Sequence, residues 1–383
     1  MILSCAYAAV LLCLLSGLLA LLLRQQGRLA TFILLGVAGL FAILAGINGL
    51  ITQSVITDQL SLGLPWLPWH VRFDSLTSFF YLILGIAIVA ISFYGPGYVK
   101  HNNDEEHPFA VLGLFSGLFI AGMLLVLLAD DAFFFMIAWE LMSVTSYFLV
   151  AFKHENSANR RAAFIYLIMA EVGAIAIILA FGVLASFADT FTFDALRSAH
   201  LSTTWASIAF AFAFLGFGMK AGLIPVHVWL PEAHPVAPSH ISALMSGVML
   251  KVAVYGFIRF NYDLLGNIQW QWGFIVLVIG SASAVLGVLY AIMQHNLKRL
   301  LAYHSVENIG IIFIGLGLSM IFLGTGHPQL AVVALVAALF HTLNHAIFKS
   351  LLFLGAGSIL QETGENNIER MGCLLYTSPS PRD

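Results

Sequence analysis

Long apolar runs recur along the whole chain and constrain its fold more than any other feature. Lipid offers no hydrogen-bond partners, so a run of about 20 apolar residues crosses a membrane as a helix whose backbone groups bond to one another. Only 9% of the 383 residues are charged, against about 25% in a typical soluble protein. The sequence therefore predicts an all-α polytopic membrane protein in a lipid bilayer, with no nucleic-acid partner.

These runs predict about eleven transmembrane helices. The expected spans are residues 1–23, 29–52, 74–95, 108–129, 130–151, 160–186, 205–230, 239–260, 270–294, 299–323 and 329–360. The first run lacks a basic leader and a cleavage site, which indicates a retained span rather than a signal peptide. Residues 53–73 contain Trp66 and Trp69 and are expected at the membrane interface, where tryptophan is enriched.

Basic residues between the spans predict the orientation of the chain. Nine follow odd-numbered spans: Arg24, Arg28, Lys100, Lys153, Arg160, Arg161, Lys298, Arg299 and Arg370. Three follow even-numbered spans: Arg72, Arg197 and Arg259. Cytoplasmic loops are rich in lysine and arginine, so we expect a multi-pass protein of the bacterial inner membrane with its N-terminus outside.

Prolines interrupt the apolar run near residues 220–231. Pro225 and Pro231 each lack a backbone donor and clash with the preceding turn, so they predict a broken helix. Such a break is tolerated inside a membrane where it is buried or lines a wet cavity, and many ion transporters bind ions there. Lys220, just before the break, is therefore a candidate for proton translocation. The alternative is a simple kink, with the lysine reaching toward the interface.

Three histidines flank this break, and we expect one of them to gate proton uptake from the cytoplasm. They are His227, His234 and His240.

Glu140 lies near the middle of the fifth span. A lone carboxylate is costly at that depth, whereas one that is protonated or paired with a lysine is tolerated. We expect Glu140 to oppose Lys220, so that separating the two would favour loss of the lysine's proton. The alternative is a permanently neutral glutamic acid that only packs. Glu171, in the next span, is a further candidate of this kind.

His341, His345 and Lys349 follow one another at four-residue intervals and therefore share one helical face. Successive side chains lie about 6 Å apart, a distance that water bridges, so the face is expected to conduct protons. A zinc site is the first alternative, although no third ligand is evident. A polar stripe that holds helices together is the second.

Two further ionisable residues lie inside predicted spans. Lys251 is expected to connect Lys220 with the face of His341 and Lys349. Glu307 is expected either to pair with Lys349 or to pack between helices.

No motif of the chain predicts a cofactor, a metal ion or a catalytic residue. Its three cysteines, Cys5, Cys13 and Cys373, have no metal-ligand spacing, and the sequence contains no CxxC, P-loop or GxGxxG motif. We therefore expect any redox chemistry to belong to partner subunits rather than to this chain.

Several strings resemble the antiporter-like subunits of respiratory complex I and of Mrp-type cation/proton antiporters. They are Trp139-Glu140, residues 218–221 with 225–234, and the span of Lys251. Within that group the chain looks closest to the large membrane subunits of hydrogenase-4 and formate hydrogenlyase. This second similarity rests on residues 237–251, 296–310 and 341–357.

The resemblance implies an organisation and a role for each candidate residue. Glu140 and Lys220 would form the family's coupled pair, Lys251 the connecting lysine, and His341, His345 and Lys349 part of a central hydrophilic axis. The family has about 14 core helices in inverted repeats, of which this chain would be a truncated version. The implied units are residues 1–128 (helices 1–4), 129–262 (first repeat with the broken helix), 263–372 (start of the second repeat) and 373–383 (a non-native tail).

The resemblance also implies a function. The chain would translocate protons, or sodium ions, in the membrane arm of a hydrogenase-4-like, formate-hydrogenlyase-like or complex I-like complex. Its partners would be other membrane-arm subunits and a peripheral hydrogenase or quinone-reductase arm. One alternative is an Mrp-type antiporter subunit without a redox partner, and a second is a scaffold that anchors a hydrogenase.

Overall fold

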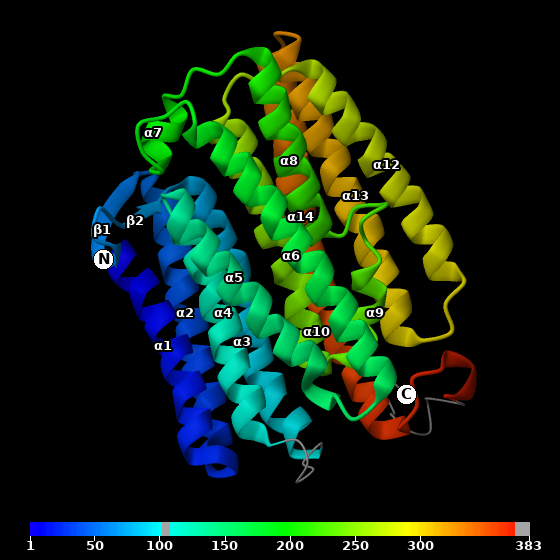
Figure 1. Ribbon diagram of the computed structural model, residues 1–383. Coiled ribbons are helices and arrows are strands. Elements are labelled where there is room, and N and C mark those ends of the chain that lie inside the picture. The colour runs from blue at the N-terminus through cyan, green and yellow to red at the C-terminus, as the bar shows by residue number, and fades with distance from the viewer. Residues whose placement is uncertain (102–107, 372–383) are drawn as a thin grey trace.

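The computed structural model describes residues 1–101 and 108–371 and shows a bundle of long helices (Figure 1). Ten helical segments in this part of the chain are long and apolar enough to cross a membrane. The first, Ile2–Thr52, consists of two helices joined by a short 3₁₀ turn, so the predicted number of about eleven spans is confirmed. The predicted tail, residues 373–383, lies outside the described residues.

The long helices are α1 (Ile2–Leu23), α2 (Arg28–Thr52), α3 (Ser75–His101), α4 (Phe109–Leu128), α5 (Ala132–Val150), α6 (Ser157–Ala185), α8 (Thr203–Ala221), α12 (Trp270–Ile292), α13 (Leu297–Gly324) and α14 (Pro328–Thr363). One further span is composite and contains α10 (Ser239–Leu244), η3 (Met245–Met249), α11 (Leu250–Ile258) and η4 (Arg259–Leu264). The short elements are η1 (Arg24–Gly27), β1 (Ile56–Leu64), β2 (Leu67–Phe73), η2 (Ala151–Lys153), α7 (Phe193–Arg197), α9 (Trp229–Val236) and η5 (Ile368–Arg370).

The composite span lies at the centre of the bundle. All of its most apolar window is buried, whereas only 28% of the corresponding windows of α12 and α14 is buried. Two of its segments, η3 and η4, are π-helical and flank the nine residues of α11. Single π-helical turns inside helices are frequent at functional sites, and the sequence analysis did not foresee them.

A β-hairpin occupies the segment that was expected only to lie at the interface. β1 and β2 pair antiparallel, and together with α7 they lie at one end of the bundle, called the hairpin end below (Figure 1). The hairpin is fixed to the start of α5, because the His70 amide donates to Asp131 and the Trp69 ring stacks on Phe134 at 4.5 Å. Pro65 and the two tryptophans had led us to expect an interfacial segment here rather than two strands.

The predicted helix break is present between α8 and α9. α8 ends at Gly222, whose φ of 85° is a left-handed conformation that glycine adopts without strain. Side chains satisfy backbone groups near the break, since Trp229 donates to the Met219 carbonyl and the Ile224 amide donates to Ser283. Pro225 lies inside the break.

Pro231 has a different position from the one expected. It is the third residue of α9, where a backbone amide has no acceptor within the helix, so proline is tolerated there. Pro231 therefore belongs to the first turn of the second helix rather than to the gap.

Close helix packing in the second half of the chain depends on glycine. A Cβ atom on Gly310 of α13 would lie 2.5 Å from the Ala284 amide nitrogen and 2.6 Å from the Gly280 carbonyl oxygen of α12. Both obstacles are backbone atoms, which cannot move aside without separating the helices. Small residues at such contacts let membrane helices approach closely and gain dispersion energy.

This packing predicts that Gly310→Ala destabilises the protein by about 1–3 kcal/mol, as overpacking does. Thermal unfolding in detergent should show a lower Tm. Gly355→Ala in α14 is the matched control, because its Cβ would meet nothing within 4 Å. Equal effects of the two substitutions would contradict the prediction.

Candidate functional site

Lys220 is buried where three helices meet. Its side chain is in the last turn of α8, 3% exposed, and its ammonium donates to Ser143 of α5 and Tyr166 of α6, both at 2.9 Å. The ammonium also lies 6.0 Å from the ring centre of Trp139 and 5.1 Å from that of Tyr166. Hydroxyls and aromatic faces thus replace the water that this charge would otherwise need.

Glu140 interacts with Lys220 but does not touch it. Among the described residues no ion pair of 4 Å or less joins them, although Glu140 is within electrostatic range of both Lys220 and Glu171. Ser143, about one turn further along α5, occupies the position next to the ammonium instead. The expected contact is therefore an electrostatic interaction at longer range in this conformation.

Tyr166 links Lys220 to the composite span. Its hydroxyl bonds to Ser146 at 2.5 Å and approaches the Met249 sulfur at 3.7 Å. Met249 ends η3 and lies two residues before Lys251. The polar contacts from Lys220 thus reach the Lys251 helix, where the next group is a thioether, a weak acceptor that carries no exchangeable proton.

Hydrogen bonds to shared residues connect Lys251 with Lys349. The fully buried Lys251 ammonium donates to the Ser246 carbonyl at 2.6 Å, and the Ser246 hydroxyl bonds to that of Ser305 at 2.7 Å. Ser305 donates to the Leu301 carbonyl at 3.0 Å, and Lys349 donates to the same carbonyl at 2.8 Å. Three spans are joined in this way, and none of these bonds involves a carboxylate.

His341 and His345 lie on one face of α14, with ring centres 6.3 Å apart. His341 bonds to Asn308 at 3.0 Å, whereas both ring nitrogens of His345 are buried without a partner in the described structure. His345 is within electrostatic range of Lys251 and Lys349. The described residues contain no group of three ligands that could hold a metal ion, the arrangement that the zinc alternative would need.

Glu307 bonds to His304 on its own helix at 2.6 Å rather than to Lys349. Its backbone also faces Gly287 of α12, where a Cβ atom would lie 2.6 Å from the Glu307 amide nitrogen. The position fits the packing alternative, with a longer-range electrostatic interaction with Lys349.

Of the three candidate gating histidines, His234 has the most lysines within electrostatic range. It is fully buried on α9, stacks on Phe353 at 4.9 Å, and neither ring nitrogen has a partner among the described residues. It interacts with Lys349, Lys298 and Lys251. His240 is equally buried, its ring contacts those of Tyr98 and Phe32, and Lys298 is the lysine within its electrostatic range.

His227, the third of these histidines, lies at the edge of the break. Its ring faces Tyr290 and Tyr303, with centres 6.4 and 6.2 Å away.

Lys298 lies between these histidines and the end of the bundle opposite the hairpin. It is 3% exposed, donates to the Ala237 carbonyl at 2.9 Å, and lines a cavity of about 360 Å³. Asn296, Asn366 and Lys153 line the same cavity. The sequence analysis had counted Lys298 only as a loop charge.

The sequence analysis missed the hydroxyl groups that connect the lysines. They are those of Ser143, Ser146, Tyr166, Ser246 and Ser305. Serine and tyrosine are common on helix faces in membranes, so these residues carried no signal except their burial beside the lysines.

Comparisons with known proteins agree with this fold. The sequence profile described as NADH:quinone oxidoreductase/Mrp antiporter, transmembrane, matches residues 129–381. Hydrogenase-4 component B of Escherichia coli (strain K12) is 39% identical over 376 residues, which cover 94% of this chain and 56% of that protein. A Na(+)/H(+) antiporter subunit from Bacillus subtilis (strain 168) is 31% identical over 293 residues, covering 76% and 36%.

A solved structure is also similar. A chain of the membrane-bound sulfane sulfur reductase, an archaeal respiratory membrane complex, superposes with a TM-score of 0.80 at 26% identity, over 94% of this chain and 57% of that one. The chain spans about half the length of the curated relatives it matches first.

The Lys220 centre predicts a specific loss on removal of one hydroxyl. Among the described residues, Tyr166→Phe leaves the buried ammonium with Ser143 as its one hydrogen-bond partner, and it should cost about 1.5–3 kcal/mol of stability, as loss of a bond to a charged group does. Thermal unfolding in detergent measures the loss. Tyr147→Phe is the control, since that hydroxyl makes no hydrogen bond to the described residues, and an equal loss there would argue against the assignment.

Proposed function

Because the chain belongs to the NADH:quinone oxidoreductase/Mrp antiporter family of membrane proteins, we propose that it carries protons through the membrane as one subunit of a larger complex. The observation that supports this most directly is the set of hydrogen bonds to Ser246, Ser305 and Leu301 that connects Lys251 with Lys349. Buried ammonium groups bonded to carbonyls and hydroxyls can lose and regain a proton, whereas ammonium groups locked to carboxylates are held charged.

Lys220 and Glu140 would couple Lys251 and Lys349, called the lysine row here, to the rest of the complex. In the described conformation the Lys220 ammonium is held by two hydroxyls while Glu140 stands apart. A rearrangement that brings the carboxylate to the ammonium would hold the lysine charged, and one that separates them would release its proton. The released proton would pass to Lys251, and Lys220 would then be recharged from the cytoplasmic side.

The Met249 sulfur interrupts the route of polar groups from Lys220 to Lys251. It lies between the Tyr166 hydroxyl and the Lys251 helix, and a thioether neither donates nor relays a proton. Proton transfer from Lys220 to Lys251 therefore needs water to enter beside Met249. A dry gap that becomes wet only during turnover would prevent a continuous leak.

Uptake would use the cavity at Lys298 and then His234. A neutral buried imidazole can accept a proton at one nitrogen and release it at the other, and Lys298, Lys251 and Lys349 are within electrostatic range of His234. This assignment selects one of the three gating candidates.

The expected setting is a respiratory complex of a bacterial inner membrane. The N-terminus and the hairpin end would lie outside, and the Lys298 cavity would face the cytoplasm. Other membrane-arm subunits and a hydrogenase or quinone-reductase arm would drive the charge movements, by similarity to the hydrogenase-4 relative. Sodium is the alternative ion.

A second function is supported by the similarity to a sodium/proton antiporter protein. The chain would then exchange protons for sodium ions without a redox partner. A sodium gradient imposed on vesicles with no electron donor would drive proton movement in this case and leave the pH unchanged in the first. A scaffold that only anchors a hydrogenase predicts no dependence of ion transport on the buried lysines.

Lys220→Met and Glu140→Gln test the main proposal in the full-length protein assembled with its partners. Proton uptake into inverted vesicles, followed with a pH-sensitive dye during electron transfer, should fall about 10²-fold or more, as loss of a proton-transfer group does. Arg161→Met is the control, since this exposed side chain lies outside the row. Undiminished uptake by an assembled Lys220→Met complex would rule the mechanism out.

His234→Leu tests the uptake route, and His240→Leu is a matched control with equal burial. We expect the first to slow proton uptake at least about tenfold and the second to leave it near the wild-type rate. The reverse order would move the gating role to His240.

A further inference from the structure

A second polar row runs from Lys251 to the hairpin end. Lys251, Tyr255, Arg259 and Asp263 follow one another at four-residue intervals and so lie along one face of the composite span. Arg259 is about 12 Å further along the helix than Lys251. The three residues from Lys251 to Arg259 are each at most 4% exposed, so the row leads from the middle of the bundle toward its surface.

The guanidinium of Arg259 uses all five of its N–H donors at this point. Nε donates to the Tyr255 hydroxyl at 3.2 Å, and Nη1 donates to Asp74 at 2.7 Å and to Asp263 at 2.9 Å. Nη2 donates to Asp74 at 2.8 Å and to Thr77 at 3.2 Å. Tyr255 lies on the side of Arg259 toward Lys251, and Asp263 lies on the side toward the hairpin end. Arg259 therefore separates these two residues of the row.

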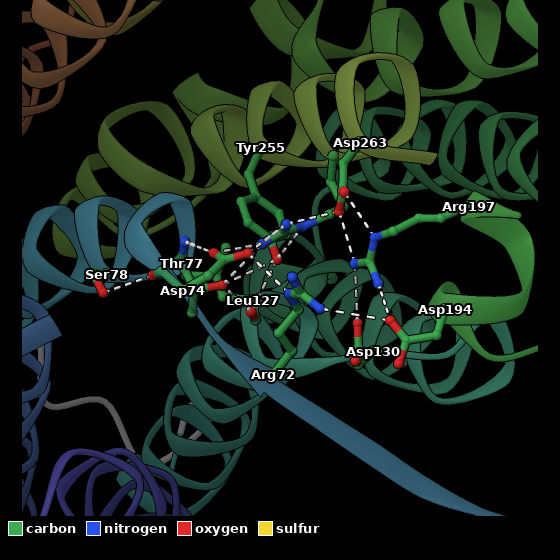
Figure 2. A network of polar contacts seen from close by, with 11 residues as sticks. Arg72, Asp74, Thr77, Ser78, Leu127, Asp130, Asp194, Arg197, Tyr255 and Asp263 are labelled. Atoms are coloured by element: carbon green, nitrogen blue, oxygen red, sulfur yellow. Dashed lines mark hydrogen bonds and ion pairs between the residues drawn. The ribbon is translucent and has the colours of Figure 1, made fainter. Parts of the chain in front are cut away.

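Neighbouring helices close around the same point. The hydroxyls of Tyr255 and Thr77 both donate to the Leu127 carbonyl at 3.0 Å, which ties the composite span to α3 and to the end of α4. Figure 2 shows Asp74, Thr77 and Tyr255 converging beside Leu127. Arg259 is thus surrounded by three helices rather than exposed to lipid.

An outer layer of charges surrounds this point. Arg197 bonds twice to Asp263, at 2.8 and 2.9 Å, and also pairs with Asp194, while Arg72 bonds to Asp74 at 3.2 Å (Figure 2). Asp130, 3.4 Å from Arg197, is the loosest member, and burial raises its pKa to about 6 despite that arginine.

Asp74 lies outside the row and accepts two hydrogen bonds from Arg259. Burial alone would raise its pKa, but the hydrogen bonds and charge of Arg259, with smaller contributions from the Thr77 amide and Arg72, hold the pKa of Asp74 below its ordinary value. Asp74 therefore stays ionised and cannot take up a proton while Arg259 is in place. Without Arg259, Asp74 would lose two hydrogen bonds and keep only those to Arg72 and the Thr77 amide among the described residues.

We propose that Arg259 seals the row against ions at the hairpin end. Its five N–H groups occupy the oxygens of Asp74 and Asp263 and the hydroxyls of Tyr255 and Thr77, which keeps the two carboxylates from acting as relays. The inference rests on the proposed function, because a seal matters only if Lys251 exchanges protons. It assigns a role to a network that the transport mechanism does not use.

Passive proton leak tests the seal in the full-length complex, in vesicles without an electron donor. After an acid jump, Arg259→Gln should dissipate the pH gradient about tenfold faster than wild type or more. Arg259→Lys should leak less than Arg259→Gln but more than wild type, because one ammonium cannot engage both carboxylates. Arg259→Gln with Asp74→Asn should return close to the wild-type rate, because the new acceptor is removed.

Arg72→Gln is the matched control, because Arg72 also binds Asp74 but lies on β2 outside the row. It should leave the leak unchanged. A tight, assembled Arg259→Gln complex would overturn the proposal, as would a double variant that leaks as fast as Arg259→Gln alone. If Arg259→Gln does not assemble, a tight Arg259→Lys complex overturns it. Passive leak needs no pumping, so loss of the proposed function and loss of the seal are measured separately.

Discussion

The absence of water in the bilayer core governs every charged group of this protein. A buried ammonium that lacks partners costs several kcal/mol, so each lysine inside the bundle must find an acceptor. Lys251, Lys298 and Lys349 each donate to a backbone carbonyl, and Lys220 donates to two hydroxyls. In the described part of the chain, no lysine of this group forms an ion pair with a carboxylate.

The arginines at the hairpin end, in contrast to these lysines, are bonded to carboxylates. Arg197 and Arg259 are each bonded to two or more aspartates at the hairpin end. Guanidinium groups keep their proton and match carboxylates in fork geometry, whereas an ammonium changes its charge readily when buried. Among these cations, Lys220, Lys251 and Lys349 therefore lie inside the bundle with hydroxyl or carbonyl acceptors, whereas Arg197 and Arg259 lie at the hairpin end with aspartates.

The sequence predicted the spans well and the contacts poorly. Hydropathy reports the transfer of a segment into lipid, so the eleven helices and the break before Pro225 could be predicted. It contains no information on pairing, so the hairpin of residues 56–73 and the hydroxyl of Tyr166 were missed. Four-residue spacing placed His341 beside His345 correctly, since that spacing is a property of the helix itself.

Interactions between helices required the structure. The distance from Glu140 to Lys220 depends on how α5 and α8 pack, and Ser143 rather than Glu140 contacts the ammonium. The roles of the candidate residues in transport stay predictions.

The two π-helical segments have a mechanical consequence for Lys251. A π turn holds more residues than an α turn, so tightening η3 into α-helix would twist α11 about its own axis. Because Arg259 directly follows α11 as the first residue of η4, the same twist would also act on Arg259. Tightening η3 would therefore turn the Lys251 side chain toward other neighbours and strain the five hydrogen bonds of Arg259.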